Sequence, residues 1–167
     1  MPDSSPVAPV VSPAPTAGAP RRVLLADDSP VVRRMLEFAI DDRSAVIALV
    51  GEATDGAAAV DMLDQHRPDA LIIDNRMPVM CGVEAIRLIR ARAMPVEIIM
   101  FSSDPTAEDE AMAAGADAFF LKGAAGPVDL VDYLLGAPTT RGPGTVGRAV
   151  AEALGHTRVS GAGQLRS

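Results

Sequence analysis

The sequence predicts an α/β fold with one doubly wound, five-stranded parallel sheet, and two observations lead to this prediction. Short apolar runs alternate with segments of helical periodicity from residue 22 to residue 135, which is typical of parallel strands joined by crossover helices. Runs such as Leu71–Ile73 are apolar without interruption, as expected when helices cover both faces of a sheet.

The expected strands are aliphatic runs that stop at polar residues, glycine or proline. The first run stops before Asp27, and the third, Ala-Leu-Ile-Ile-Asp, ends with Asp74. In chain order, the expected strands cover 22–26, 45–50, 70–74, 96–101 and 116–121.

The expected helices follow these strands and carry recognisable start signals. Ser29 is suited to be the N-cap of the first helix, with Pro30 in its first position, where proline is favoured. Asp55 opens the second helix and Pro127 starts the last. In chain order, the expected helices cover 30–40, 55–65, 82–92, 106–114 and 127–135.

The segments outside this alternation differ from it in composition. A length of 167 residues suits one domain, which we expect at 21–136. Residues 1–20 are rich in Pro, Ala and Ser, which predicts a disordered leader. Residues 137–167 predict a mostly flexible tail with a possible short helix at 145–154, or alternatively a docking or oligomerisation segment. The apolar stripe of that helix has helical spacing and consists of Val146, Val150, Ala153 and Leu154.

Composition excludes several classes of protein. The net charge is −7 and the pI about 4.7, which disfavours nucleic-acid and anionic-membrane binding. A single cysteine, Cys81, rules out an internal disulfide and fits a reducing compartment. The N-terminus lacks the features of a signal peptide, and no apolar run is long enough to span a membrane. We therefore expect a cytoplasmic protein.

Reactive side chains follow four of the five expected strands. In the flavodoxin-like strand order 2-1-3-4-5, strands one and three are neighbours at the switch point, where such sheets bind ligands. The carboxyl ends of the strands share one edge, so we expect these side chains to converge there. They are Asp27 and Asp28 after the first strand, Asp74 after the third, Ser102 after the fourth and Lys122 after the fifth.

This set of side chains predicts a magnesium site with phosphoryl chemistry. Three carboxylates close together repel one another unless a cation joins them, and oxygen ligands without a His or Cys cluster favour Mg²⁺. A carboxylate neutralised by a metal can attack phosphorus and form a mixed anhydride. Lys122 and Ser102 could supply positive charge and a donor to the transferred oxygens.

These residues make the segment from Arg22 to Leu135 resemble the receiver domain of two-component response regulators, the CheY-like family. The resemblance implies that Asp74 is the phosphoacceptor and Lys122 a catalytic residue. It also implies that Ser102 is the switch hydroxyl, which turns with the aromatic side chain of Phe119. The implied Mg²⁺ ligands are Asp27 (through water), Asp28, Asp74 and the backbone carbonyl of Arg76.

The resemblance further implies a function and a set of partners. A sensor histidine kinase or a histidine phosphotransfer protein would donate the phosphoryl group, and a downstream protein would bind the phosphorylated form, with phosphorylation-dependent dimerisation possible. Only 31 residues follow Gly136, fewer than the roughly 50 of a small domain, so we expect a single-domain regulator. Such a protein is not an enzyme beyond its own phosphorylation and dephosphorylation. A phosphorelay intermediate is the alternative.

Two departures from the family pattern leave further alternatives open. Gly123 stands where the family has a proline after a cis peptide bond. We expect a trans bond here, a less firmly placed Lys122, and some support for a non-switching scaffold. Arg76 and Asp104 occupy the two variable positions beside the phosphoryl group, and we expect them to pair across the site. A phosphatase of the haloacid-dehalogenase type would need an acid at the position of Arg76, so we disfavour that hypothesis.

Overall fold

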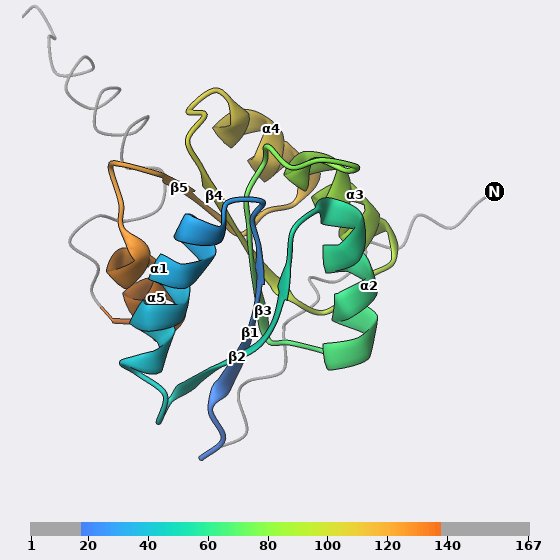
Figure 1. The fold of residues 1–167 in the computed structure, drawn as a ribbon. Helices are drawn as coiled ribbons and strands as arrows, with labels where there is room; N and C mark the ends of the chain where they lie inside the picture. Colours follow the sequence, from blue (N-terminus) through green and yellow to red (C-terminus); the bar gives the residue numbers. More distant parts are fainter. Residues whose placement is uncertain (1–17, 138–167) are drawn as a thin grey trace, which may run out of the picture.

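The computed structural model describes residues 18–137 as five strands and five helices in strict alternation (Figure 1). Residues 1–17 of the expected leader and the expected tail helix at 145–154 lie outside the described residues. The strands are β1 Arg21–Ala26, β2 Ile47–Ala53, β3 Ala70–Ile73, β4 Glu97–Ser102 and β5 Ala118–Leu121. The helices are α1 Pro30–Asp41, α2 Gly56–His66, α3 Gly82–Ala91, α4 Ala107–Ala114 and α5 Pro127–Leu134.

The strands form one sheet in the order β2-β1-β3-β4-β5, and every neighbouring pair is parallel. The predicted doubly wound fold and its strand order are therefore confirmed. Ile73 pairs with Ala26 on one side and with Met100 on the other. The loops that follow β1, β3 and β4 consequently leave the sheet at the same edge.

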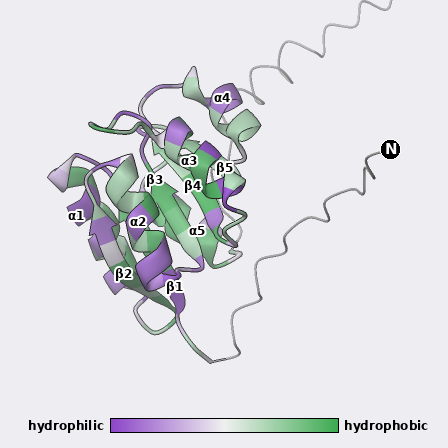
Figure 2. Ribbon diagram, turned by 90° about the vertical axis from the view of Figure 1, so that its right-hand side faces the viewer, coloured by the Kyte–Doolittle hydropathy of each residue, from purple (hydrophilic) through white to green (hydrophobic). Residues whose placement is uncertain are grey.

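Helices cover both faces of this sheet, with α1 and α5 on one side and α2, α3 and α4 on the other (Figure 1). Alternate residues of β1 supply the two cores: Val23 and Leu25 pack with α1 and α5, whereas Leu24 and Ala26 pack with the other helices. Figure 2 shows the hydrophobic strands of the sheet, in green, beside helices that carry both hydrophilic and hydrophobic residues. Burial on both faces explains why the strands lack polar alternation.

Two of the expected helix starts have the predicted capping bonds. The Ser29 hydroxyl accepts a hydrogen bond from the Val32 amide (3.4 Å), and the Asp55 carboxylate accepts one from the Ala58 amide (2.8 Å). These bonds satisfy amide groups that have no partner within the helix. The first of them sets the start of α1 directly after the acidic pair that ends β1.

Two expected strands differ from the observed ones by two or more residues at a boundary, and the other three differ by a single residue at one or both ends. We expected the second strand at 45–50, but turns extend to Val46, and β2 runs on to Ala53 through a shift in register against Val23 and Leu24. We expected the fifth strand at 116–121, but β5 starts only at Ala118. The left-handed cap Gly115 ends α4 and the next residues form the turn. Apolar runs mark strands well, but they do not distinguish a strand from the turn that leads into it.

Candidate functional site

Three aspartates gather at the carboxyl edge of the sheet, as predicted. Asp27 and Asp28 follow β1 and Asp74 follows β3. One carboxylate oxygen of each lies within 4.8 Å of those of the other two. Asp27 and Asp74 are only 3% and 6% exposed, whereas Asp28 is open to solvent. The cluster therefore has two buried acids and one that a hydrated ion can reach.

Lys122 reaches this cluster from the end of β5. Its ammonium group donates a hydrogen bond to Asp27 Oδ2 at 2.7 Å and lies 3.2 Å from Asp74 Oδ1. It also sits over the ring of Phe101, with Nζ 5.5 Å from the centroid. The side chain is thus held by two carboxylates and a ring. The expected loose placement of Lys122 is wrong.

Gly123 explains how the chain leaves Lys122 without the family's proline. The peptide bonds of residues 18–137 are all trans, which confirms that expectation. Gly123 has φ +91°, a conformation that glycine adopts without strain. The next turn closes through hydrogen bonds from the Ala124 and Ala125 amides to the Leu121 carbonyl. Glycine thus replaces proline with a different turn of the β5–α5 loop.

Asp74 carries the least satisfied group of the site. Its Oδ1 is buried and accepts no hydrogen bond, because the approach of Lys122 is an ion pair without hydrogen-bond geometry. Burial raises the pKa of Asp74 above its ordinary value of 3.8, Lys122 opposes the rise and the charge of Asp27 adds to it. Three carboxylates against one ammonium leave net negative charge. This donor set fits a hard divalent cation such as Mg²⁺.

The loop after β3 fixes the position of Asp74. The Asp74 amide donates to the Ala26 carbonyl (2.8 Å), which anchors the residue to β1. The Asn75 side chain accepts from the Val83 amide (3.2 Å), and the Asn75 carbonyl accepts from the Gly82 amide (3.0 Å). A Cβ atom at position 82 would stand 2.2 Å from the Asp74 carbonyl oxygen. Glycine at this position is therefore required for α3 to start so close to the site.

Ser102 and Phe119 lie near the same edge and are both buried. Ser102 ends β4 with no exposed surface; its hydroxyl accepts a hydrogen bond from the Asp104 amide (3.2 Å) and its carbonyl accepts one from the Lys122 amide (2.8 Å). Phe119 is 3% exposed and belongs to the core that includes Ala107 and Ala111 of α4. The serine hydroxyl is thus tied to the β4–α4 loop, and the ring packs under α4.

The sequence profile of the response regulator receiver domain matches residues 23–134. The chain belongs to the response regulator receiver family. The matched segment contains the five strands' carboxyl ends and every side chain of the site described above. Receiver domains are phospho-accepting signalling domains that typically bind Mg²⁺ at an acidic pocket, and this chain has a cluster of three aspartates at the carboxyl edge of its sheet.

Curated relatives share about a third of the aligned residues. The chain is 35% identical over 103 residues to the transcriptional regulatory protein NarL and 36% over 107 residues to PdtaR, both of Mycobacterium tuberculosis. It is 39% identical over 105 residues to a protein-glutamate methylesterase/protein-glutamine glutaminase of a Nocardioides species. These alignments cover 60%, 64% and 60% of this chain. The chain spans 47%, 51% and 28% of those relatives' lengths.

Solved receiver structures match the fold. The signal receiver domain of Mycobacterium tuberculosis NarL has a TM-score of 0.63 and 30% identity, over 71% of this chain and 98% of that one. The response regulator domain of Thermotoga maritima CheB has a TM-score of 0.58 and 33% identity, over 70% and 88% of the two chains. No helix in the described part of this receiver is long and apolar enough to cross a membrane.

The expected pairing of Arg76 with Asp104 is not found among the described residues. Asp104 Oδ1 instead accepts two hydrogen bonds from Thr106, from its amide (3.0 Å) and its hydroxyl (2.6 Å). These bonds lower the pKa of Asp104, and the charge of Arg76 contributes only a smaller decrease. Arg76 itself is exposed. The expected pair does not form because Asp104 binds donors of Thr106, two residues away in the same turn.

One supporting residue of this receiver site is not recognisable from the sequence. An arginine at this position of an amphipathic helix would be expected to face solvent, but Nη1 of Arg33 donates to the Asp27 carbonyl at 2.7 Å and its Nε to Glu52 at 3.0 Å. It thereby ties the first turns of α1 to the end of β2. Its position one turn after the N-cap Ser29 placed it near Asp27, but nothing in the sequence placed Glu52 there.

Proposed function

We propose that this receiver works as a single-domain response regulator that accepts a phosphoryl group on Asp74 in a Mg²⁺-dependent reaction. The donor is a sensor histidine kinase or a histidine phosphotransfer protein. The observation that carries the proposal is the buried Oδ1 of Asp74, which has no hydrogen-bond partner and lies 3.2 Å from an ammonium group. An acceptor oxygen in this state is available to bond to phosphorus.

The proposed transfer is a substitution at phosphorus. An oxygen of the ionised Asp74 carboxylate forms a bond to the phosphorus of a phosphohistidine while the P–N bond breaks, and the electron pair of that bond stays on the imidazole nitrogen. Lys122, 3.2 Å from Asp74 Oδ1, stabilises the negative charge that builds up on the phosphoryl oxygens. The product is an acyl phosphate on Asp74.

Asp27, Asp28, Asp74 and the Arg76 carbonyl would hold the Mg²⁺ ion in this proposal. The ion supplies charge neutralisation for the carboxylates and the phosphoryl oxygens when it is bound. Asp28 is solvent-exposed and suits a direct ligand. Asp27 already accepts hydrogen bonds from the Ser29 amide (2.8 Å) and from Lys122 (2.7 Å), which suits contact through water.

Ser102 and Phe119 would transmit the modification. We infer that the Ser102 hydroxyl exchanges its contact with the Asp104 amide for one with a phosphoryl oxygen, because it lies on β4, next to the strand that carries Asp74. The β4–α4 loop would then move toward the site, with Phe119 beneath it. The surface formed by α4, β5 and α5 would thereby change shape and bind a downstream protein in the cytoplasm.

The proposal assigns no nucleic-acid, membrane or general phosphatase activity to this receiver. A net charge of −7 supports protein partners over nucleic acid. Phosphorylation-dependent dimerisation belongs to the same proposal, as does a role as phosphorelay intermediate, in which Asp74 returns the phosphoryl group to a histidine.

The experiment is to incubate the full chain with Mg²⁺ and acetyl phosphate and to map a base-labile adduct by mass spectrometry. We expect a single adduct on Asp74 that disappears when Mg²⁺ is chelated, and none in Asp74→Asn. Asp69→Asn is the matched control, because Asp69 lies at the opposite end of β3, and it should be phosphorylated normally.

Each of the other outcomes would indicate a different function. If neither acetyl phosphate nor a histidine kinase labels Asp74, the chain is a scaffold with a receiver fold and the proposal is wrong. Rapid hydrolysis of unrelated phosphate esters would indicate a phosphatase instead. Transfer of the label from Asp74 to a histidine phosphotransfer protein would identify the relay role.

A further inference from the structure

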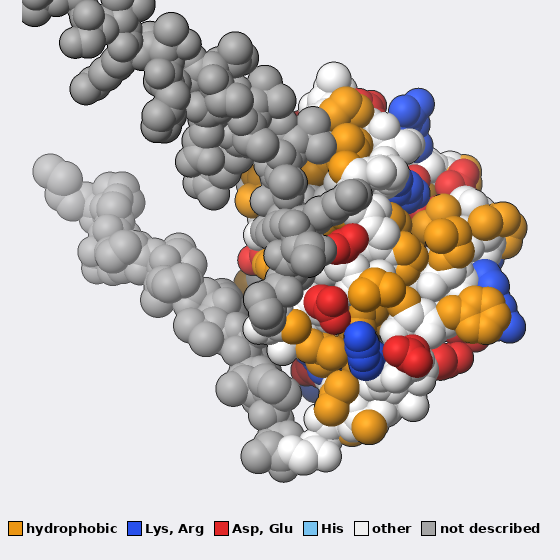
Figure 3. All heavy atoms as spheres, turned by 90° about the vertical axis from the view of Figure 1, so that its left-hand side faces the viewer, with side chains coloured by type: hydrophobic (Ala, Val, Ile, Leu, Met, Phe, Trp, Pro, Cys, Tyr) orange, Lys and Arg blue, Asp and Glu red, His pale blue; other side chains and the backbone are white. Residues whose placement is uncertain are grey.

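An apolar patch lies on α1 and α5, away from the carboxylate cluster. We define it by four side chains with at least half of their surface exposed: Val31 (66%), Met35 (51%), Phe38 (60%) and Val128 (55%). They are four of the seven large hydrophobic side chains that are exposed in the described part of the chain. Figure 3 looks onto this side of the molecule and shows hydrophobic side chains gathered among charged ones. A concentrated patch of this kind marks a surface that is covered by something.

The patch includes a groove between the two helices. One depression runs along Met35, Phe38 and Ala39 of α1 and Pro127, Val128 and Val131 of α5. A second adjoins it, shares Met35 and Pro127, and reaches Phe101 and Lys122. Asp42 and Arg43 complete the lining of the first depression, and Lys122 is part of the lining of the second. A third helix could pack in this groove as helices pack in bundles.

The net charges of the two parts of the chain favour one occupant of this groove over another. Residues 18–137 contain 11 Lys and Arg against 20 Asp and Glu, so two copies of this body repel each other. Next to the groove the charges are mixed: Asp42 and Asp132 pair with Arg43 (3.8 and 3.7 Å), and Arg34 lies over the ring of Phe38. Residues 138–167 contain four Arg and one Glu. Residues 138–167 are therefore attracted to the negatively charged body, whereas a second receiver body is not. Three of their arginines, Arg141, Arg158 and Arg166, flank the segment 145–154, which is itself neutral.

The segment 145–154 has the right pattern and length for the groove. At 100° per residue, Val146, Val150 and Leu154 fall on one side of a helix, and Arg148 and Glu152 fall on the opposite side. Ten helical residues span about 15 Å, against about 18 Å for the 12 residues of α1. Residues 135–144 join this segment to α5, and they contain Gly-Pro-Gly at 142–144. A connection of this length exceeds what two antiparallel neighbouring helices need.

We propose that residues 145–154 form a helix that docks in the α1–α5 groove, antiparallel to α5, with Val146, Val150, Ala153 and Leu154 on the apolar patch. The proposal does not depend on phosphorylation of Asp74.

Disulfide trapping in the full chain tests the docking. Cys81→Ser removes the one native thiol, and Val128→Cys with Val150→Cys then places one thiol on the patch and one on the segment. We expect oxidation to give an intramolecular disulfide at least about tenfold faster than in a matched control with Met112→Cys and Val150→Cys, since docking raises the effective concentration of the thiols. Met112 is 45% exposed but lies on α4, on the other side of the sheet.

A second substitution tests whether the apolar side chains of the segment are needed for docking in the α1–α5 groove. Leu154→Asp in the Val128→Cys/Val150→Cys chain should remove most of the tenfold advantage, whereas Glu152→Gln on the opposite side should leave it. Equal rates in the patch and control pairs, or no effect of Leu154→Asp, would overturn the proposal. Disulfide-linked dimers that form in preference to the internal bond would assign the patch to a second copy and overturn it as well. Thermal unfolding of each variant checks that the receiver is folded.

Discussion

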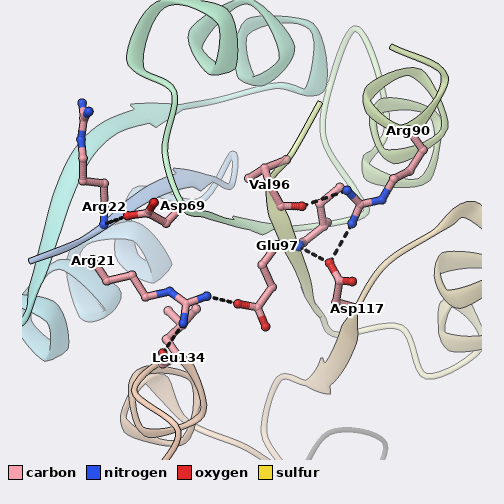
Figure 4. Close-up of polar contacts among 9 residues, drawn as sticks. Arg21, Arg22, Asp69, Arg90, Val96, Glu97, Asp117 and Leu134 are labelled. Carbon is pink, nitrogen blue, oxygen red and sulfur yellow. Dashed lines mark hydrogen bonds and ion pairs between the residues drawn. The ribbon is translucent and has the colours of Figure 1, made fainter. Parts of the chain in front are cut away.

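The carboxylates at the two ends of the sheet differ in how they are paired. At the carboxyl end, Asp27, Asp28 and Asp74 share a single nearby ammonium, and Asp74 Oδ1 has no hydrogen bond. At the amino end, each carboxylate that bridges two strands or loops meets a guanidinium or a backbone amide (Figure 4). At the carboxyl end, unbalanced negative charge is left to interact with a ligand. At the amino end, the charged groups are paired and stabilise the sheet.

The amino end joins segments that are far apart in sequence. Arg21 at the start of β1 pairs with Glu97 of β4 and donates to the Leu134 carbonyl of α5 at 2.6 Å. Arg90 of α3 donates to the Val96 and Gly115 carbonyls (2.8 Å each) and to Asp117 (2.7 Å). The buried Nε of Arg21 lacks a partner, but both terminal nitrogens of that side chain are bonded. Substitutions at the two ends should therefore affect different measurements.

The largest expected effect is on the rate of phosphorylation at the carboxyl end. Lys122→Ala removes the one ammonium that faces Asp74, so we expect the adduct from acetyl phosphate to form about 100-fold more slowly at saturating Mg²⁺, the loss typical of a removed charge-stabilising donor. Time-resolved mass spectrometry measures this rate. A loss below about threefold would show that Lys122 serves only the packing of the loop.

Gly82→Ala should break the backbone support of the carboxyl end. A Cβ 2.2 Å from the Asp74 carbonyl must displace backbone, so we expect the free energy of unfolding to fall by about 3 kcal/mol. Gly126→Ala is the control, because the nearest atom to its new Cβ is 3.8 Å away, and it should change stability by less than about 1 kcal/mol. Urea denaturation compares the two. Equal stabilities would mean that the β3–α3 loop adapts freely.

Arg90→Met should weaken the amino end without touching the chemistry. It leaves two carbonyls and Asp117 without their guanidinium partner, so we expect a loss of about 2 kcal/mol in unfolding free energy. Arg87→Met, which removes only the exposed ion pair to Glu110, should change it by less than about 0.5 kcal/mol. Both variants should be phosphorylated at the wild-type rate. A slow rate in Arg90→Met would mean that the two ends are coupled.

The two ends also differ in how far the sequence predicted them. Asp27, Asp74 and Lys122 each follow a recognisable apolar strand, so the sheet rule alone brings them to one edge. Arg90 and Arg33 lie on amphipathic helices, and an arginine on a helix surface has the same local pattern whether it binds a carbonyl or faces water. Besides one nearby carbonyl each, they bind Glu52, Gly115 and Asp117, which are 19 to 27 residues away, and only the tertiary structure identifies these distant partners.

The smallest expected effect is the change in stability when Asp74→Asn removes one negative charge from the aspartate cluster. Asp74→Asn keeps the shape of the side chain and leaves Lys122 paired with Asp27, while it abolishes the cost of burying a second carboxylate beside Asp27. We expect the variant to be more stable than the wild type by about 1 kcal/mol at pH 7 without Mg²⁺, a few degrees in Tm. Saturating Mg²⁺ should stabilise the wild type more than Asp74→Asn, and calorimetry measures both shifts.

The pH dependence of this difference identifies its origin. Folding raises the pKa of Asp74 because the side chain is buried, so the folded chain binds the proton more tightly than the unfolded chain does. The wild type therefore loses stability, relative to Asp74→Asn, as pH rises from the unfolded value of 3.8 through the higher folded pKa. Below pH 3.8 the contribution of this ionisation should vanish. A gain in Asp74→Asn that is the same at pH 4 and pH 7 would trace it to packing rather than to the buried charge.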